Sequence, residues 1–108
     1  MYGVIGRFIA APGQSDALLA ILMEGVESDE RMPGCLSYVV ARDPADPAGI
    51  WVTEVWDSAE SHRASLTLPR VKAAISRAMP LIAGFREHFE TEPVGGIGLM
   101  EDLTKDHQ

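Results

Sequence analysis

The sequence predicts an α+β domain of the ferredoxin-like type, with helices covering one face of a four-stranded antiparallel sheet. Three observations predict it: the order of strand-like and helix-like segments, the hydrophobic spacing inside each segment, and the turn residues between them. A chain of 108 residues fits one domain. We assign this domain to residues 1–93, and residues 94–108 to a flexible or partner-crossing C-terminal tail.

The first third of the chain predicts a strand followed by a helix. Residues 2–10 carry apolar side chains in both alternating sets, which is typical of a strand covered on both faces. After the turn residues Ala11-Pro12-Gly13, apolar residues recur at helical spacing. The helix is expected to begin near Ser15 and to end at Pro33-Gly34.

The rest of the chain predicts a hairpin of two strands, two short helices and a final strand. In order, these elements are expected over residues 35–42, 50–56, 58–66, 71–79 and 84–92. Asp57 and Glu60 match a capping box ahead of the first short helix, and Pro69 marks a break between the two helices. The resulting order, β-α-β-β-α-β, is that of the ferredoxin-like arrangement.

Composition and charge exclude several classes of partner. A net charge of −7 argues against nucleic acid and against an anionic membrane surface, because both require clustered Lys and Arg. Cys35 is the single cysteine, so no intrachain disulfide can form, which fits a reducing compartment. With no signal-peptide pattern and no long apolar run, we expect a cytoplasmic protein without a membrane segment.

The apolar character of both faces of the first and third strands predicts a homodimer. Helices can cover only one face of the sheet, and the other face also needs cover. A second copy of the same sheet, packed through a two-fold interface, is the simplest solution.

Several segments together resemble the antibiotic-biosynthesis-monooxygenase domain family over roughly residues 2 to 92. They are Phe8 to Gly13 ahead of a helix, Pro33-Gly34-Cys35-Leu36-Ser37-Tyr38, Asp43-Pro44 with Asp46-Pro47, and Glu54-Val55-Trp56-Asp57-Ser58-Ala59-Glu60. The resemblance implies a dimeric ferredoxin-like α+β barrel with a pocket between sheet and helices in each subunit. It also implies oxidation of phenols or quinols with O₂, without metal or flavin, as in the best-studied members.

The chain departs from this family at three positions. Many members have a His-x-x-Ser-Pro-His pattern beginning nine residues after the Trp. Here Ser65 and Arg70 occupy the two histidine positions. The haem-degrading branch uses a histidine in this region as iron ligand, so haem is not expected. Val52 lies near the position where several oxygenating members have an asparagine.

Glu54 and Trp56 are the first two candidates for a substrate site. Side chains two apart on a strand point to the same face, so they project together, and Trp51 points the other way. Trp56 is either a pocket wall or part of the core. Glu54 is either a hydrogen-bond partner or base for the substrate, or the partner of a strand neighbour such as Arg7. The pairing with Arg7 is favoured, because a half-buried carboxylate normally has a cation beside it.

His62 and Tyr38 complete the set of candidates. His62 lies in the first short helix and is the candidate catalytic acid or base, because imidazole changes charge near neutral pH. It is otherwise an exposed helix residue or a packed one bonded to backbone. Tyr38 lies in the middle of its strand, where its hydroxyl lines the pocket or is satisfied locally.

Basic residues gather in the second helical region, at Arg63, Arg70, Lys72 and Arg77. They could attract an anionic substrate, although a solvated helix face is the commoner explanation. The histidines lack close spacing and no Cys/His cluster exists, so no metal site is predicted.

The resemblance therefore implies a cofactor-independent monooxygenase that oxidises a small quinol or phenolic substrate with O₂. His62 would be catalytic, and Trp56, Tyr38 and Glu54 would bind the substrate. The alternatives are a non-catalytic dimeric module that binds a small molecule, and a related isomerase on a small metabolite. A closed apolar pocket with one or two polar groups favours the first, a filled pocket the second, and an open polar pocket the third.

Overall fold

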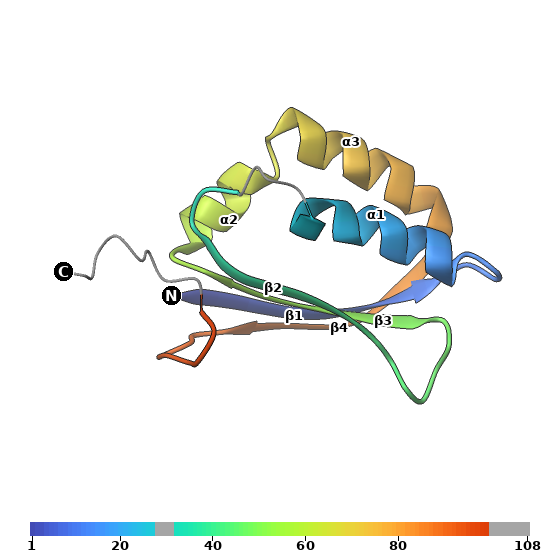
Figure 1. Cartoon of the computed structure of the whole chain (residues 1–108), viewed down its shortest axis with the longest axis horizontal. Helices are drawn as coiled ribbons and strands as arrows, with labels where there is room; N and C mark the ends of the chain where they lie inside the picture. Colours follow the sequence, from blue (N-terminus) through green and yellow to red (C-terminus); the bar gives the residue numbers. More distant parts are fainter. Residues whose placement is uncertain (28–31, 100–108) are drawn as a thin grey trace.

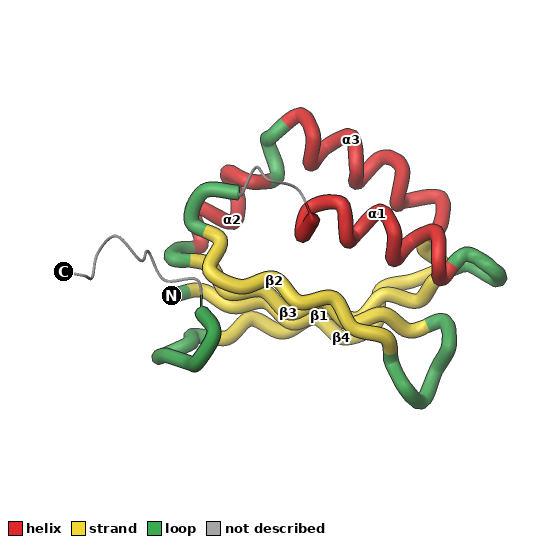
Figure 2. Tube along the Cα trace, viewed as in Figure 1, coloured by secondary structure: helices red, strands yellow, loops and turns green. Residues whose placement is uncertain are grey.

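A computed structural model describes residues 1–27 and 32–99. Four strands form one sheet, and the helices lie together over one face of it (Figures 1 and 2). The strands are β1 (Tyr2–Ala10), β2 (Cys35–Arg42), β3 (Gly49–Trp56) and β4 (Ile82–Thr91). The helices are α1 (Ser15–Glu27), α2 (Ala59–Ser65) and α3 (Pro69–Ala78), followed by a 3₁₀ turn at Met79–Leu81.

The sheet confirms the predicted ferredoxin-like α+β fold. Its strand order is β2-β3-β1-β4, and each neighbouring pair is antiparallel. β1 and β3 are therefore the central strands, and α1 and α3 run side by side above them (Figure 1).

Two details of the second helical region differ from the prediction. Pro69 does not separate two helices but is the first residue of α3, where its missing N–H and its fixed φ cost nothing. The cap of α2 is Ser58 rather than Asp57, because the Ser58 hydroxyl accepts the backbone N–H of Ser61 at 3.1 Å. The expected end of the first helix at Pro33-Gly34 falls next to residues 28–31, which lie outside the described residues.

The core lies between the sheet and α1. Even-numbered residues of β1 and β3 point toward the helices, and the two strands pair in a register that sets Val4 against Glu54 and Gly6 against Val52. The most completely buried side chains of this layer are Leu18, Ile50 and Trp56. The residues of β3 that face the helices are therefore held by the core on both sides of Glu54.

The opposite face of the sheet carries one ion-pair cluster and exposed apolar side chains. Arg7 Nε lies 2.6 Å from Glu87 Oε1, and its guanidinium stands 5.5 Å from the centre of the Trp51 ring. Val39 and Phe89 are both 53% exposed. Within the described chain, no helix covers this face.

A glycine joins the start of β2 to the entry of α2. Gly34 has φ of +84°, and a Cβ there would come within 2.5 Å of Ser61 Oγ. Its carbonyl accepts the backbone N–H of Asp57 at 2.8 Å. Glycine alone adopts this positive φ readily and leaves room for the Ser61 side chain. The hydrogen bond between Gly34 and Asp57 therefore holds the beginning of α2 against the sheet.

After β4 the chain has no further helix or strand through residue 99. Residues 100–108 of the predicted tail lie outside the described residues, so the boundary at residue 93 stays a prediction. None of the helices in the described ranges has the length and apolar content needed to span a membrane.

Candidate functional site

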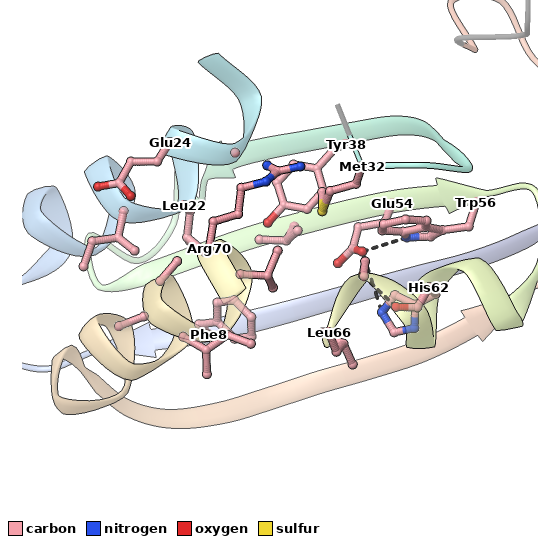
Figure 3. A pocket seen from close by; sticks show the side chains of 18 residues that line it. Phe8, Leu22, Glu24, Met32, Tyr38, Glu54, Trp56, His62, Leu66 and Arg70 are labelled. Carbon is pink, nitrogen blue, oxygen red and sulfur yellow. Dashed lines mark hydrogen bonds and ion pairs between the residues drawn. The ribbon is translucent and has the colours of Figure 1, made fainter. Parts of the chain in front are cut away.

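A pocket of about 420 Å³ lies between the sheet and the helices. Most of its lining is apolar, and each strand and helix except β4 contributes to it. The lining consists of Phe8, Ile21, Leu22, Glu24, Gly25, Met32, Tyr38, Val52, Glu54, Trp56, His62, Ser65, Leu66, Arg70, Val71, Ala74, Ile75 and Ala78. Figure 3 shows Glu54, Trp56 and His62 grouped at one end of this pocket.

Glu54, Trp56 and His62 form a contact triad. Trp56 Nε1 donates a hydrogen bond to Glu54 Oε1 at 2.9 Å, and His62 Nε2 lies 3.9 Å from the same oxygen. The Trp56 and His62 rings meet edge to face with centroids 5.4 Å apart. The indole orients the carboxyl and also packs against the imidazole, so three side chains hold one another in place (Figure 3).

Burial raises the pKa of the Glu54 carboxyl above its ordinary value, and the indole hydrogen bond and the neighbouring His62 offset only part of this. The favoured pairing of Glu54 with Arg7 is wrong. Arg7 stands opposite Trp51 in the β1–β3 register, so it projects from the other face of the sheet. Its ion pairs are with Glu87, Asp43 and Asp46.

Two aromatic rings contact the His62 side chain, and a serine hydroxyl bonds to its backbone. Its ring lies 5.5 Å from the Tyr2 ring as well as against Trp56, and its carbonyl accepts the hydroxyl of buried Ser65 at 2.6 Å. The hydroxyl of Tyr2 in turn donates to Glu90 Oε2 at 2.7 Å. The His62 side chain is only 22% exposed, so it is a pocket residue of α2 and not a solvated one.

Tyr38 lies beside Glu54 across the β2–β3 ladder and also lines the pocket. Burial, with the nearby Glu54 carboxyl as a smaller cause, raises the pKa of the Tyr38 hydroxyl. Tyr38 therefore stays protonated at neutral pH and can donate a hydrogen bond to a ligand. The four predicted site residues thus all line one pocket, although their roles stay predictions.

Sequence reasoning noted Val52 and Ser65 only as departures from the family pattern, and Arg70 both as a departure and as one of four basic residues that could attract an anion. All three line the pocket. These residues occupy positions where relatives carry functional side chains, and such positions face the site. That correspondence was the signal that could have identified them as pocket residues. Among the described residues, no group of three or more His, Cys, Asp or Glu is arranged to hold a metal ion.

The fold and this pocket define a class of protein: a small α+β domain with an apolar pocket between sheet and helices. The family model for antibiotic biosynthesis monooxygenases matches residues 1–77. The chain belongs to the antibiotic biosynthesis monooxygenase family. A comparison with curated proteins finds no match.

Solved structures agree with this assignment. A protein of the same family name from Chloroflexus aurantiacus is 64% identical, with a TM-score of 0.84 over 91% of this chain and 97% of that one. Another, from Deinococcus radiodurans, is 26% identical, with a TM-score of 0.75 over 93% of this chain and 99% of that one. A third, from Nitrosomonas europaea, is 15% identical, with a TM-score of 0.78 over 88% of this chain and 100% of that one; it shows the fold alone.

Proposed function

We propose that the protein is a monooxygenase that oxidises a small quinol or phenol with O₂ and uses no bound metal or flavin. The observation that carries this proposal is the Glu54 carboxyl, which is 16% exposed, has a raised pKa and lies beside His62 in an apolar pocket. Family membership supports the reaction class. The pocket is not filled by side chains and is lined mainly by apolar groups, which favours this function over the non-catalytic module with a filled pocket.

The chemistry requires a base more than a cofactor. Removing the hydroxyl proton of a quinol yields an electron-rich anion, which passes one electron to O₂. The resulting superoxide and substrate radical combine at a ring carbon, and a proton completes the hydroperoxide. Loss of water breaks the O–O bond and leaves a carbonyl, so that a quinol C₆H₆O₂ and O₂ give a hydroxyquinone C₆H₄O₃ and H₂O. The substrate supplies all the electrons.

Each polar residue has a role in this scheme. Glu54 is the base that takes the hydroxyl proton, since a carboxylate with a raised pKa is a stronger base. His62 stabilises the charge on Glu54 and passes the proton onward. Tyr38 donates a hydrogen bond to the substrate anion, and the apolar walls with Trp56 exclude water.

Oxygen uptake with benzene-1,4-diol tests the proposal. We expect uptake of one O₂ per quinol, unchanged by EDTA, and a fall in kcat/KM of about 100-fold or more for His62→Gln, the range typical of a lost acid–base group. Arg63→Gln is the matched control, because that side chain is 66% exposed on the same helix and lies outside the lining.

Uptake no faster than autoxidation in buffer, across a panel of quinols and anthrones, would exclude this reaction. Glu54 and His62 could also move a proton between two carbons of a metabolite, as an isomerase requires. Turnover of a keto substrate without oxygen uptake would identify that alternative.

We also propose that the uncovered face of the sheet packs against a second copy of the chain. Val39 and Phe89 lie on this face, each 53% exposed, on the two edge strands β2 and β4. Trp51 on β3 and Ile5 on β1 lie between these two edge strands. Trp51 stands opposite Arg7, and Ile5 stands opposite Phe89. A sheet face with apolar side chains on all four strands fits a second copy of itself through a two-fold axis.

Light scattering tests this interface. The wild-type chain should have twice its mass of 11.7 kDa at micromolar concentration. Val39→Asp should shift it toward the monomer, because a charge would be buried without a partner. Val26→Asp is the matched control, since Val26 is 42% exposed on α1, away from this face. A wild-type monomer, or equal effects of the two substitutions, would contradict the interface.

A further inference from the structure

We infer that Tyr2 is a positioning residue of this site: its ring holds the His62 imidazole in the orientation that brings Nε2 to Glu54. This rests on the proposed function only in giving His62 a part in turnover, because the ring contact and its effect on the imidazole do not depend on the reaction. Tyr2 is outside the pocket lining, so it would act through His62 and not on the substrate.

The short helix that carries His62 does not fix the imidazole. α2 has seven residues, and helices of this length are marginal in water without tertiary contacts. The Ser58 cap and the Gly34 carbonyl hold the start of the helix, and the Ser65 hydroxyl bonds to the His62 carbonyl. These contacts position the backbone of α2. The side-chain torsions of His62 are set by the groups that its ring touches.

The imidazole lies among Glu54, Trp56 and Tyr2. Glu54 Oε1 is 3.9 Å from Nε2, which is too far for a hydrogen bond, so the carboxyl alone does not orient the ring. The Trp56 ring meets the imidazole at 67° and the Tyr2 ring at 40°, with centroids 5.4 and 5.5 Å away. Tyr2 and Trp56 are direct partners in the β1–β3 ladder, so the sheet sets their two rings side by side beneath α2.

The Tyr2 ring is anchored at its far end. Its hydroxyl donates a hydrogen bond to Glu90 Oε2 at 2.7 Å, the short distance typical of a charged acceptor. This bond is the largest cause that raises the pKa of the Tyr2 hydroxyl, so the phenol stays a donor at neutral pH. Glu90 stands opposite Val4 on the edge strand β4. A ring tied at its tip to a strand is a fixed surface against which His62 can rest.

The chemistry makes the orientation of His62 important. A proton passes between Glu54 and His62 only when the imidazole nitrogen faces the carboxyl, and a misplacement of about 1 Å can cost about 100-fold in rate. Trp56 cannot separate this effect from folding, because it is fully buried and also bonds to Glu54. Tyr2 is half-buried and belongs neither to the buried core nor to the lining. Loss of its ring should release the imidazole and leave the pocket walls in place.

Tyr2→Leu and Tyr2→Phe test the role of the ring in the full-length protein. With benzene-1,4-diol, Tyr2→Leu should lower kcat by about 10- to 100-fold and leave KM unchanged, because the substrate does not touch residue 2. Tyr2→Phe keeps the ring and should restore most of the wild-type kcat. A residue that served only the stability of the fold would not separate kcat from KM in this way.

NMR measures the orientation directly. In the wild-type protein, proton cross-peaks should join the His62 ring to the Trp56 indole, with the His62 signals identified by their absence in His62→Gln. These cross-peaks should remain in Tyr2→Phe and be lost in Tyr2→Leu. They do not involve protons of residue 2, so their loss reports movement of the imidazole and not the missing tyrosine.

Phe85→Leu is the matched control. It also removes an aromatic ring from the helix side of the sheet, where Phe85 is 56% exposed and packs against Phe8 with centroids 5.3 Å apart. Phe85 does not line the pocket, so kcat and the cross-peaks should be unchanged. If Tyr2→Leu does not fold, as judged by urea unfolding, Glu90→Ala replaces it. Freeing the Tyr2 hydroxyl should weaken the same cross-peaks, and cross-peaks as strong as those of the wild type would then overturn the inference.

The NMR result needs no turnover, so this inference and the proposed function fail separately. Cross-peaks lost in Tyr2→Leu, in a protein whose wild type consumes no oxygen, would support the role of Tyr2 and remove the monooxygenase proposal. A folded Tyr2→Leu with wild-type oxygen uptake and intact cross-peaks would keep that proposal and overturn the role of Tyr2.

Discussion

Glu54→Gln is expected to lower kcat/KM for a quinol substrate by about 100- to 10,000-fold, the range that a positioned base contributes. Glutamine keeps the size of the side chain and an oxygen that can accept the indole N–H of Trp56, so the fold should be unaffected. In the wild-type enzyme, kcat/KM should fall as pH drops through the raised pKa of Glu54, because the base must be deprotonated. The variant should lack that limb of the pH profile.

The same substitution makes a prediction about stability. Folding raises the pKa of Glu54 above its ordinary value of 4.5, so between these two pKa values the folded state binds more protons than the unfolded state. The free energy of unfolding contributed by this group therefore decreases as pH rises through that window. Glu54→Gln should be at least as stable as the wild type at neutral pH, where the wild-type protein holds a buried charge.

Steady-state oxygen uptake and urea unfolding between pH 4.5 and 8 measure both effects. Glu60→Gln is the matched control, because Glu60 is an exposed residue of α2 that does not line the pocket. A Glu54→Gln enzyme within a factor of three of wild-type kcat/KM would remove Glu54 from the reaction.

Trp56→Ala is expected to lower the free energy of unfolding by about 3–5 kcal/mol, the usual loss when a large buried aromatic ring is removed. Trp56 is 1% exposed, and its ring supports both the Glu54 carboxyl and the His62 imidazole. Its loss leaves a cavity, an unpaired buried oxygen on Glu54, and a less constrained His62. Both stability and turnover should fall.

Trp56→Phe separates the two contributions. Phenylalanine fills part of the space but cannot donate to Glu54, so stability should recover in part while the pKa of Glu54 rises further. Urea unfolding measures the first effect and the pH dependence of kcat/KM the second. A loss under about 1 kcal/mol for Trp56→Ala would contradict the buried position of the ring.

The sequence predicts the positions of the strands and the faces to which their side chains point. The alternation of apolar residues in 2–10 and 50–56 predicts strands, and their bounds agree with β1 and β3 within one residue. The same alternation places Glu54 and Trp56 on one face, which the hydrogen bond between them confirms. Strand period and turn chemistry are local properties, so a single sequence contains them.

Cross-strand partners are not local. The pairing of Glu54 with Arg7 is wrong because the β1–β3 register sets Arg7 against Trp51, on the far face. A shift of one residue would have moved Arg7 to the helix side, and no residue near Arg7 in the sequence specifies that register. Tyr38 likewise becomes a neighbour of Glu54 only through the β2–β3 ladder.

The order of elements, the ferredoxin-like fold and the face shared by Glu54 and Trp56 can be predicted from the sequence alone, because they follow from side-chain periodicity and from turn residues. The folded chain was needed to show that His62 lies beside Glu54, that Arg7 does not, and that Arg70 rather than Lys72 lines the pocket. Those outcomes depend on strand register and on how α2 and α3 close over the sheet, which join residues far apart in the chain.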